Sequence, residues 1–256
     1  AARYRWRQRA GGKFDRTRGL IISSKGAHSS IAQACRAMDT DEVSVTSDSE
    51  GRLHVENLRE AVAALAPEDR ERVFAIVATS GTTNAGVIDD LDAAADVAAE
   101  LGVWLHVDGA YGGAALAAPS VRHRYHGIER ADSFIVDPHK WLFAPFDCCA
   151  LLYADPATAK AAHTQHAEYL DVLHADEDHH GDGGGWNPSD YAHHLSRRAR
   201  GLPFWFSLAT YGTAAYTEAV EAALTVTRDA AQLVKDSEHL ELIMEPELSV
   251  LLFRRK

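Results

Sequence analysis

The sequence has no long apolar run. No segment of its 256 residues approaches the roughly 20 consecutive apolar residues that a membrane-spanning helix needs. The apolar core of a signal peptide is also missing from these residues. We therefore expect no membrane partner.

Positive charge is scarce as well. Lys and Arg number 26 against 37 Asp and Glu, which gives a formal net charge of -11. A nucleic-acid-binding protein needs an excess of Lys and Arg to neutralise phosphates, so we expect no nucleic-acid partner. Only the first 18 residues are locally basic, and there Tyr4, Trp6 and a turn at Gly11-Gly12 favour the end of a solvated helix over a targeting peptide.

Cysteine is limited to Cys35, Cys148 and Cys149. Neighbours in sequence are badly placed to bridge each other, and the third cysteine leaves no even set. This usage is typical of a reducing compartment, and we expect a cytoplasmic protein.

The remaining composition is ordinary for a globular chain, and short β-branched runs alternate with amphipathic segments. Strands are predicted at 20–24, 43–45, 72–79, 103–107, 133–136, 149–153 and 248–253, and helices at 28–38, 55–65, 91–101 and 208–233. This alternation predicts an α/β fold with a mostly parallel sheet and flanking helices. Asp108, the loop 80–86 and Lys140 would then lie beyond the carboxyl ends of strands, where open α/β sheets bind ligands.

Lys140 follows the apolar run 134–136 directly, in the stretch DSFIVDPHKWLFAPFD (132–147). An ammonium is costly in apolar surroundings, and a desolvated lysine is a good amine nucleophile toward an aldehyde cofactor. The alternative is a lysine that reaches solvent or an ion pair. Asp108 could hold a proton on the pyridine nitrogen of such a cofactor, or it could simply cap a turn.

Two motifs together resemble a known family: HVDGAYGG (106–113) and DSFIVDPHKWLFAPFDC (132–148). They are similar to the group II pyridoxal-phosphate-dependent amino-acid decarboxylases, which include aromatic-L-amino-acid, glutamate, histidine and diaminobutyrate enzymes. The likeness extends from AHSS (27–30) to the last residues. It implies an aspartate-aminotransferase-type large domain, pyridoxal 5'-phosphate as cofactor, a small amino acid as substrate and a homodimer.

The resemblance also implies roles around the cofactor ring. Lys140 would hold the cofactor covalently, and Asp108 would pair with its pyridine nitrogen. His28 would stack on one ring face and Ala110 would pack on the other. Thr83, in SGTTNAG (80–86), would lie near the ring hydroxyl and the substrate carboxylate.

The phosphate end is less regular. His139 matches a histidine near the phosphate, and Ser133 falls where the family places a phosphate contact. Asp137 departs from the pattern, because many members carry Asn there. A carboxylate beside a phosphate dianion is repulsive, so we expect no direct contact from the Asp137 side chain.

Tyr169 matches a loop tyrosine that delivers a proton to the α-carbon, where a phenylalanine accompanies aldehyde-forming relatives. The alternative is a surface tyrosine. The residues His174, Asp176, Asp178, His179 and His180 that follow lack the spacing of a zinc site. We predict loop solvation there and no metal.

The family's Gly/Ser-rich phosphate loop lies upstream of the matching region. We therefore expect a fragment, truncated at both ends and inactive alone, with a large domain over 1–236 and the start of a small domain over 237–256. The resemblance implies decarboxylation of an L-amino acid, with an aromatic substrate favoured and diaminobutyrate or glutamate open. The alternatives are an aldehyde synthase, aminotransferase or desulfurase of the same fold, or a non-catalytic form.

Overall fold

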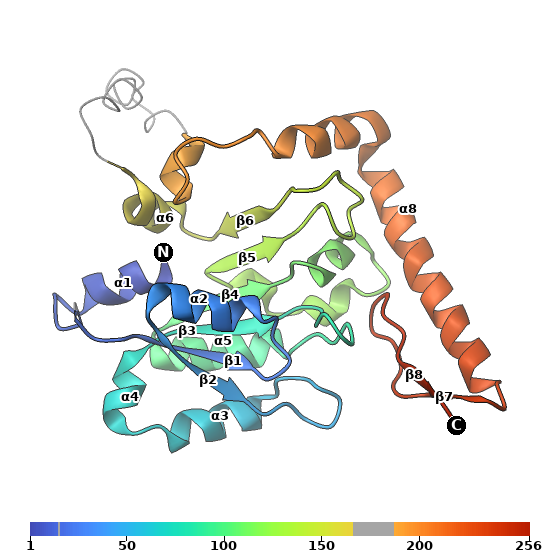
Figure 1. Ribbon diagram of the computed structural model, residues 1–256, viewed down its shortest axis with the longest axis horizontal. Coiled ribbons are helices and arrows are strands. Elements are labelled where there is room, and N and C mark those ends of the chain that lie inside the picture. The colour runs from blue at the N-terminus through green and yellow to red at the C-terminus, as the bar shows by residue number, and fades with distance from the viewer. Residues whose placement is uncertain (15, 166–186) are drawn as a thin grey trace.

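A six-stranded sheet organises the chain, whose computed structural model describes residues 1–14, 16–165 and 187–256. The strand order is β2-β1-β3-β4-β5-β6; β1 to β5 are parallel, and β6 pairs antiparallel with β5. The strands are β1 (Leu20–Ser24), β2 (Asp41–Val45), β3 (Val73–Thr79), β4 (Trp104–Asp108), β5 (Ser133–Val136) and β6 (Ala150–Tyr153). The predicted α/β class with a mostly parallel sheet is confirmed (Figure 1).

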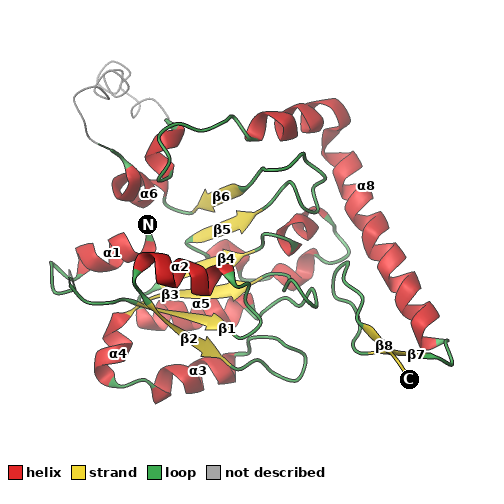
Figure 2. Ribbon diagram, in the orientation of Figure 1, coloured by secondary structure: helices red, strands yellow, loops and turns green. Residues whose placement is uncertain are grey.

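Helices pack around the sheet (Figure 2). The α-helices are α1 (Ala2–Arg9), α2 (Ser30–Met38), α3 (Val55–Ala64), α4 (Pro67–Arg72), α5 (Leu91–Leu101), α6 (Pro156–His163) and α8 (Gly201–Lys235). Short 3-10 helices occur at Gly112–Ala117, Arg122–Tyr125, Ile128–Arg130 and Pro188–Tyr191. Within the described ranges, no helix has both the length and the apolar content to cross a bilayer.

The two faces of the sheet bury separate apolar cores. On one face Ile21, Phe74 and Trp104 pack with partly buried residues of α1 and α2, such as Trp6 and Met38. The larger core on the other face joins alternate residues of the same strands to α3, α5 and α8. Burial on both faces explains why the central strands read as continuous apolar runs rather than as alternating ones.

The predicted helices are confirmed, with shifts at their ends. A 3-10 helix at Gly112–Ala117 follows β4. The last helix begins at Gly201, earlier than predicted, and its two parts meet at Gly212, whose φ of 73° and ψ of 163° break the helix. Glycine tolerates this conformation because it has no Cβ.

The predicted strand at 248–253 is wrong. Residues 246–250, here called the C-terminal strap, lie against loops at the carboxyl ends of β3 and β4, where Leu248 is close to Gly81 and Gly112. Leu248 is buried there, and the Ser249 amide donates to the Tyr111 hydroxyl at 3.1 Å. Pairing starts only at β8 (Phe253–Arg255), which joins β7 (Leu240–Leu242) in a two-stranded sheet. The proposed domain boundary at 236 stays a prediction.

Asp89 and Asp90, the two residues before α5, have different roles. Asp90 caps α5, because its carboxylate accepts from the Ala93 amide at 3.1 Å. Asp89 is buried instead, and its two oxygens accept from the amides of Leu53 at 2.8 Å and Thr79 at 2.7 Å. Burial raises the pKa of Asp89 to about 7. This carboxyl group ties the segment before α3 to the end of β3.

Replacing Asp89 with Asn should destabilise the fold. One accepting oxygen becomes an NH2 group facing a buried N–H, which costs about 1–3 kcal/mol in the free energy of unfolding. Urea unfolding measures this loss. Asp90→Asn is the matched control, since Asn caps helices as well as Asp.

The pH dependence of that loss follows from the raised pKa. Between the ordinary Asp pKa of 3.8 and about 7, the folded protein binds more protons at Asp89 than the unfolded chain does. The contribution of Asp89 to the free energy of unfolding therefore falls as pH rises through that window. Asn does not titrate, so Asp89→Asn removes this pH dependence. The cost of Asp89→Asn should be larger at low pH than above neutrality; equal stability of variant and wild type at both would contradict the role.

Candidate active site

The carboxyl ends of β4 and β5 stay paired beyond the strands themselves. Asp108 ends β4, in register with Thr79 of β3 and Ile135 of β5. The Gly109 amide then donates to the Ile135 carbonyl, and the Asp137 amide donates to the Ala110 carbonyl, both at 3.0 Å. These bonds hold the segment after Asp108 beside the segment that leads to Lys140.

Lys140 lies at this edge in an ion pair. Its Nζ is 2.9 Å from Oδ2 of Asp137, and its backbone amide donates to the Asp137 carbonyl at 2.9 Å. The lysine side chain is 41% exposed, whereas that of Asp137 is 13% exposed. The ion pair anticipated as the alternative for Lys140 is therefore present. The covalent role stays a prediction.

Asp108 is partly buried, and its Oδ1 accepts from the Ala110 amide at 3.0 Å. The turn-capping interpretation of Asp108 is therefore also correct, and it orients the carboxylate beside Ala110. His106, two residues earlier on the same strand, is partly buried; desolvation lowers its pKa, while the charge of Asp108 acts in the opposite direction. Pairing of Asp108 with a pyridine nitrogen stays a prediction.

His28 and Thr83 lie on loops after β1 and β3, at the same edge of the sheet. Both are exposed. His28 Nδ1 accepts from the Ser30 amide at 3.2 Å, so the neutral ring carries its proton on Nε2. The strand order separates β1 from β5 by three spacings, about 14 Å at ~4.8 Å each. His28 and Lys140 thus sit at opposite ends of one row of loops, with Thr83 and Asp108 between them.

His139 and Trp141 flank Lys140 and are held firmly. His139 Nδ1 donates to the Cys148 carbonyl, which leaves Nε2 as the acceptor of the neutral ring. Trp141 is buried and stacks on Tyr111, with ring centroids 5.2 Å apart and planes at 14°. This stack joins the two sequence motifs through their side chains, and sequence reasoning missed it although both residues belong to the motifs.

Ser133 lies at the amino end of β5, paired with His106. Its buried hydroxyl accepts from Trp104 Nε1 at 2.8 Å and contacts His106 Nδ1 at 2.8 Å. Both contacts join β5 to the neighbouring strand β4, and the structure does not bring Ser133 to the group around Lys140. The phosphate contact stays a prediction without geometric support.

Three buried hydroxyls at the carboxyl ends of β1 and β3 were not singled out from the sequence. They belong to Ser24, Thr79 and Ser80, and within the described part of the chain none has a hydrogen-bond partner. A buried polar group without a partner is costly, so it calls for a ligand or a water. The signal in the sequence was the small polar residue that ends each of two apolar runs.

These groups fit the ring end of a pyridoxal cofactor better than its phosphate end. A carboxylate, an amine and unpaired hydroxyls suit a polar aromatic ring with a basic nitrogen and an aldehyde. The negative charge of Asp137 beside Lys140 does not suit a phosphate dianion. Tyr169 and the histidines from His174 to His180 lie outside the described residues.

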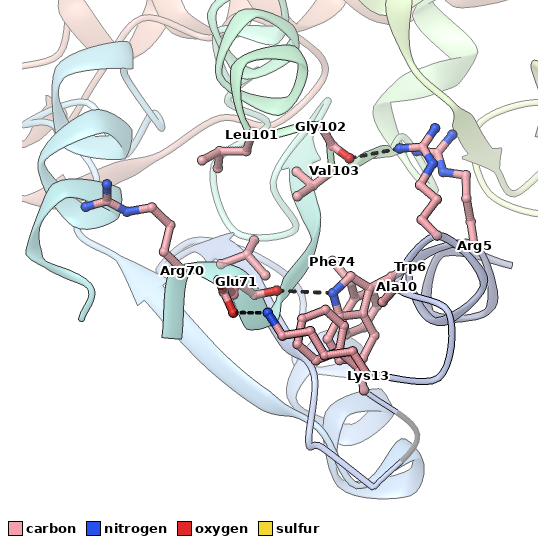
Figure 3. A pocket seen from close by; sticks show the side chains of 13 residues that line it. Arg5, Trp6, Ala10, Lys13, Arg70, Glu71, Phe74, Leu101, Gly102 and Val103 are labelled. Carbon is pink, nitrogen blue, oxygen red and sulfur yellow. Dashed lines mark hydrogen bonds and ion pairs between the residues drawn. The ribbon is translucent and has the colours of Figure 1, made fainter. Parts of the chain in front are cut away.

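A separate pocket of about 390 Å³ lies at the amino ends of β3 and β4 (Figure 3). Its basic side chains hold the N-terminal segment to the body: Arg9 donates to the Gly102 carbonyl at 3.0 Å, and Lys13 pairs with Glu71 at 2.6 Å. Trp6 donates to the Glu71 carbonyl at 3.2 Å. The predicted N-terminal helix is confirmed as α1, but it packs on the sheet more closely than a solvated helix would.

Comparison with known proteins decides the family. The family model described as "Pyridoxal-dependent decarboxylase conserved domain" matches residues 1–256. The chain belongs to this family. The resemblance read from the two motifs is thereby confirmed, and pyridoxal phosphate is the cofactor of the family.

Individual relatives agree with this assignment. The chain is 35% identical to an aromatic-L-amino-acid decarboxylase of Drosophila lebanonensis over 237 residues, covering 91% of this chain and 56% of the relative. It is 36% identical to an L-2,4-diaminobutyrate decarboxylase of Rhizobium meliloti, covering 93% of this chain and 47% of the relative. A crystal structure of Oryza sativa TDC with PLP and tryptamine matches with a TM-score of 0.91 and 30% identity, covering 100% of this chain and 52% of that one. The chain thus spans about half the length of these family members.

Ser133→Ala separates the two roles of that hydroxyl. If the hydroxyl only stabilises the sheet, the variant loses about 1–3 kcal/mol in the free energy of unfolding, because Trp104 Nε1 is left unpaired. Its affinity for the cofactor then does not change. Thermal unfolding and cofactor titration measure the two effects. A loss of cofactor affinity of about tenfold or more would instead support the phosphate contact. Ser44→Ala, at an exposed position of β2, is the control.

Proposed function

We propose that the protein catalyses the pyridoxal-phosphate-dependent decarboxylation of an L-amino acid. The observation that carries the proposal is the convergence of Asp108 and Lys140 at one edge of the parallel sheet, through the paired exits of β4 and β5. Family membership supports the same chemistry. When bound, the cofactor supplies a ring that accepts electrons from the α-carbon.

Residues of this chain would bind and orient that ring. Asp108 keeps a proton on the pyridine nitrogen, which its partly buried carboxylate favours electrostatically. Ala110, whose amide binds Asp108, leaves room for a flat ring on one face, and His28 covers the other. Lys140 supplies the amine for the aldehyde carbon, and Thr83 orients the substrate carboxylate. His139 offers Nε2 near the phosphate.

Tyr169 completes the proposal by delivering the proton to the α-carbon. This role rests on the resemblance alone, because Tyr169 lies outside the residues that the structure describes. A tyrosine here favours an amine product over an aldehyde.

The substrate class is the finer part of the proposal. Relatives named for aromatic amino acids and for diaminobutyrate share similar sequence identity with this chain. Sequence identity alone therefore does not select between these two kinds of substrate. We propose an aromatic amino acid, with diaminobutyrate and glutamate as the alternatives to be assayed beside it.

The test uses the full-length protein with pyridoxal phosphate. We expect an absorbance band at about 420 nm that borohydride abolishes, and release of CO2 with one equivalent of amine from an aromatic L-amino acid. Lys140→Ala should lose both the band and the product, since no amine remains to hold the cofactor. Lys13→Ala is the control, because its ion pair with Glu71 is exposed and lies at the opposite end of the sheet.

Other results would redirect the proposal. Aldehyde with ammonia and peroxide indicates an aldehyde synthase, and transfer of the amino group to a keto acid indicates an aminotransferase. Absence of the band in the wild-type protein would remove the enzyme proposal and favour a non-catalytic role.

We also propose a homodimer in which a second copy covers the first part of α8. Four large apolar side chains there are more than half exposed, namely Leu202, Trp205, Phe206 and Tyr211. Single exposed apolar residues are normal, but a group of this kind marks an interaction surface. All four precede the break at Gly212.

Sedimentation velocity tests the dimer. Trp205→Lys should shift the protein toward monomer, because a charge would be buried in the interface. Val226→Lys, at a 65% exposed position of α8 beyond Gly212, should leave the dimer intact. A wild-type protein that stays monomeric at all concentrations would refute the proposal.

We further propose a cytoplasmic location. All three cysteines are free in the structure, as expected in a reducing compartment. Fractionation of cells that express the protein checks this directly.

A further inference from the structure

Asp137 is the residue at the candidate site that departs from the family pattern, and its carboxylate lies against Lys140. Nζ of Lys140 and Oδ2 of Asp137 are 2.9 Å apart, with the carboxylate 13% exposed. A carboxylate this well covered is less screened by water than one at an open surface.

The backbone of Asp137 is fixed on both sides. Its amide donates to the Ala110 carbonyl at 3.0 Å, and its carbonyl accepts from the Lys140 amide at 2.9 Å. Pro138 follows directly and has a fixed φ. The carboxylate is therefore held in position, and the more exposed lysine side chain comes to it.

A thiol completes the surroundings of the carboxylate. Cys149 is exposed, yet desolvation of its thiol and the neighbouring Asp137 raise the pKa of Cys149 to about 12. The thiol thus stays protonated, and it brings no second negative charge. Among the residues that the structure describes, Lys140 is the cation paired with this carboxylate.

The ion pair works against the chemistry proposed for Lys140. The ion pair holds Nζ of Lys140 against the Asp137 carboxylate. An ammonium must give up one proton before its nitrogen can bond to an aldehyde carbon; the two remaining hydrogens then leave with the aldehyde oxygen as water. The lysine must also move away from Asp137 to reach the aldehyde.

We propose that Asp137 is a positioning residue that holds Lys140 as an ion pair in the cofactor-free protein, so that cofactor loading must break this pair. The first half of the proposal concerns the free protein alone. The second half rests on the proposed function.

Labelling of the cofactor-free, full-length protein with trinitrobenzenesulfonate tests the first half. Peptide mass spectrometry follows the modification of Lys140 at constant pH. Asp137→Asn should raise the rate roughly two- to fivefold, as expected for loss of a partly exposed ion pair. Asp147→Asn is the matched control, because Asp147 pairs with Arg198 and Arg200 instead. An unchanged Lys140 rate in Asp137→Asn would overturn the proposal.

A second measurement needs no variant. Added salt screens a partly exposed ion pair, so Lys140 labelling in the wild type should become faster between low and high ionic strength. A rate that does not respond to salt would also count against the pair.

Loading rates with two aldehydes test the second half. Pyridoxal lacks the phosphate, so it reports the lysine without phosphate repulsion. Asp137→Asn should speed the binding of both pyridoxal and pyridoxal phosphate, measured by absorbance. Faster binding of pyridoxal phosphate alone would show that Asp137 acts only by repelling the phosphate, and would overturn the proposed barrier. If neither protein binds either aldehyde, the proposed function fails, whereas the labelling result still decides whether Asp137 holds Lys140.

Discussion

The candidate site depends on one set of backbone hydrogen bonds. The bonds from Gly109 to Ile135 and from Asp137 to Ala110 keep β4 and β5 paired past their ends. Without them Asp108 and Lys140 would belong to two separate loops. With them, the carboxylate, the thin side chain of Ala110 and the lysine share one short stretch of the sheet edge. The stack of Trp141 on Tyr111 adds a side-chain contact between the same two segments.

Charge at this edge is more balanced than the motifs suggested. Lys140 is matched by Asp137, and the neighbouring thiol of Cys149 stays neutral. The resemblance to the family implies a place for position 137 near the phosphate end of the cofactor, where a negative charge is unfavourable. In this chain the carboxylate is instead the local partner of Lys140.

Much of this arrangement could be read from the sequence, for definite physical reasons. Strands buried on both faces, such as β3, leave continuous apolar runs, and parallel strands bring their carboxyl ends to one edge. These two rules were enough to predict that Asp108 and Lys140 lie at the same edge of the sheet. The ion pair with Asp137 was left open, because it depends on side-chain rotamers. The strap was missed because an apolar segment buried against loops has the same composition as a strand.

The hydroxyls of Ser24, Thr79 and Ser80 show the same limit, because only the structure shows that no described residue forms a hydrogen bond with them. Ser133 is the opposite case, because the structure supplies partners that the sequence did not predict. Its motif suggested a ligand contact, while its place opposite His106 gives its hydroxyl two partners inside the sheet.

The C-terminal strap has a consequence for how this protein can change over evolution. A Cβ at Gly112 would lie 2.2 Å from the Ser80 carbonyl oxygen and 2.8 Å from Leu248 Cδ1, and one at Gly81 would lie 3.1 Å from the same Leu248 carbon. The leucine and the two glycines therefore form a single steric unit drawn from three distant parts of the chain. A larger residue at either glycine requires a smaller one at 248 as well as a shift of backbone. A side chain at Gly81 or Gly112 is thus sterically coupled to the side chain at position 248.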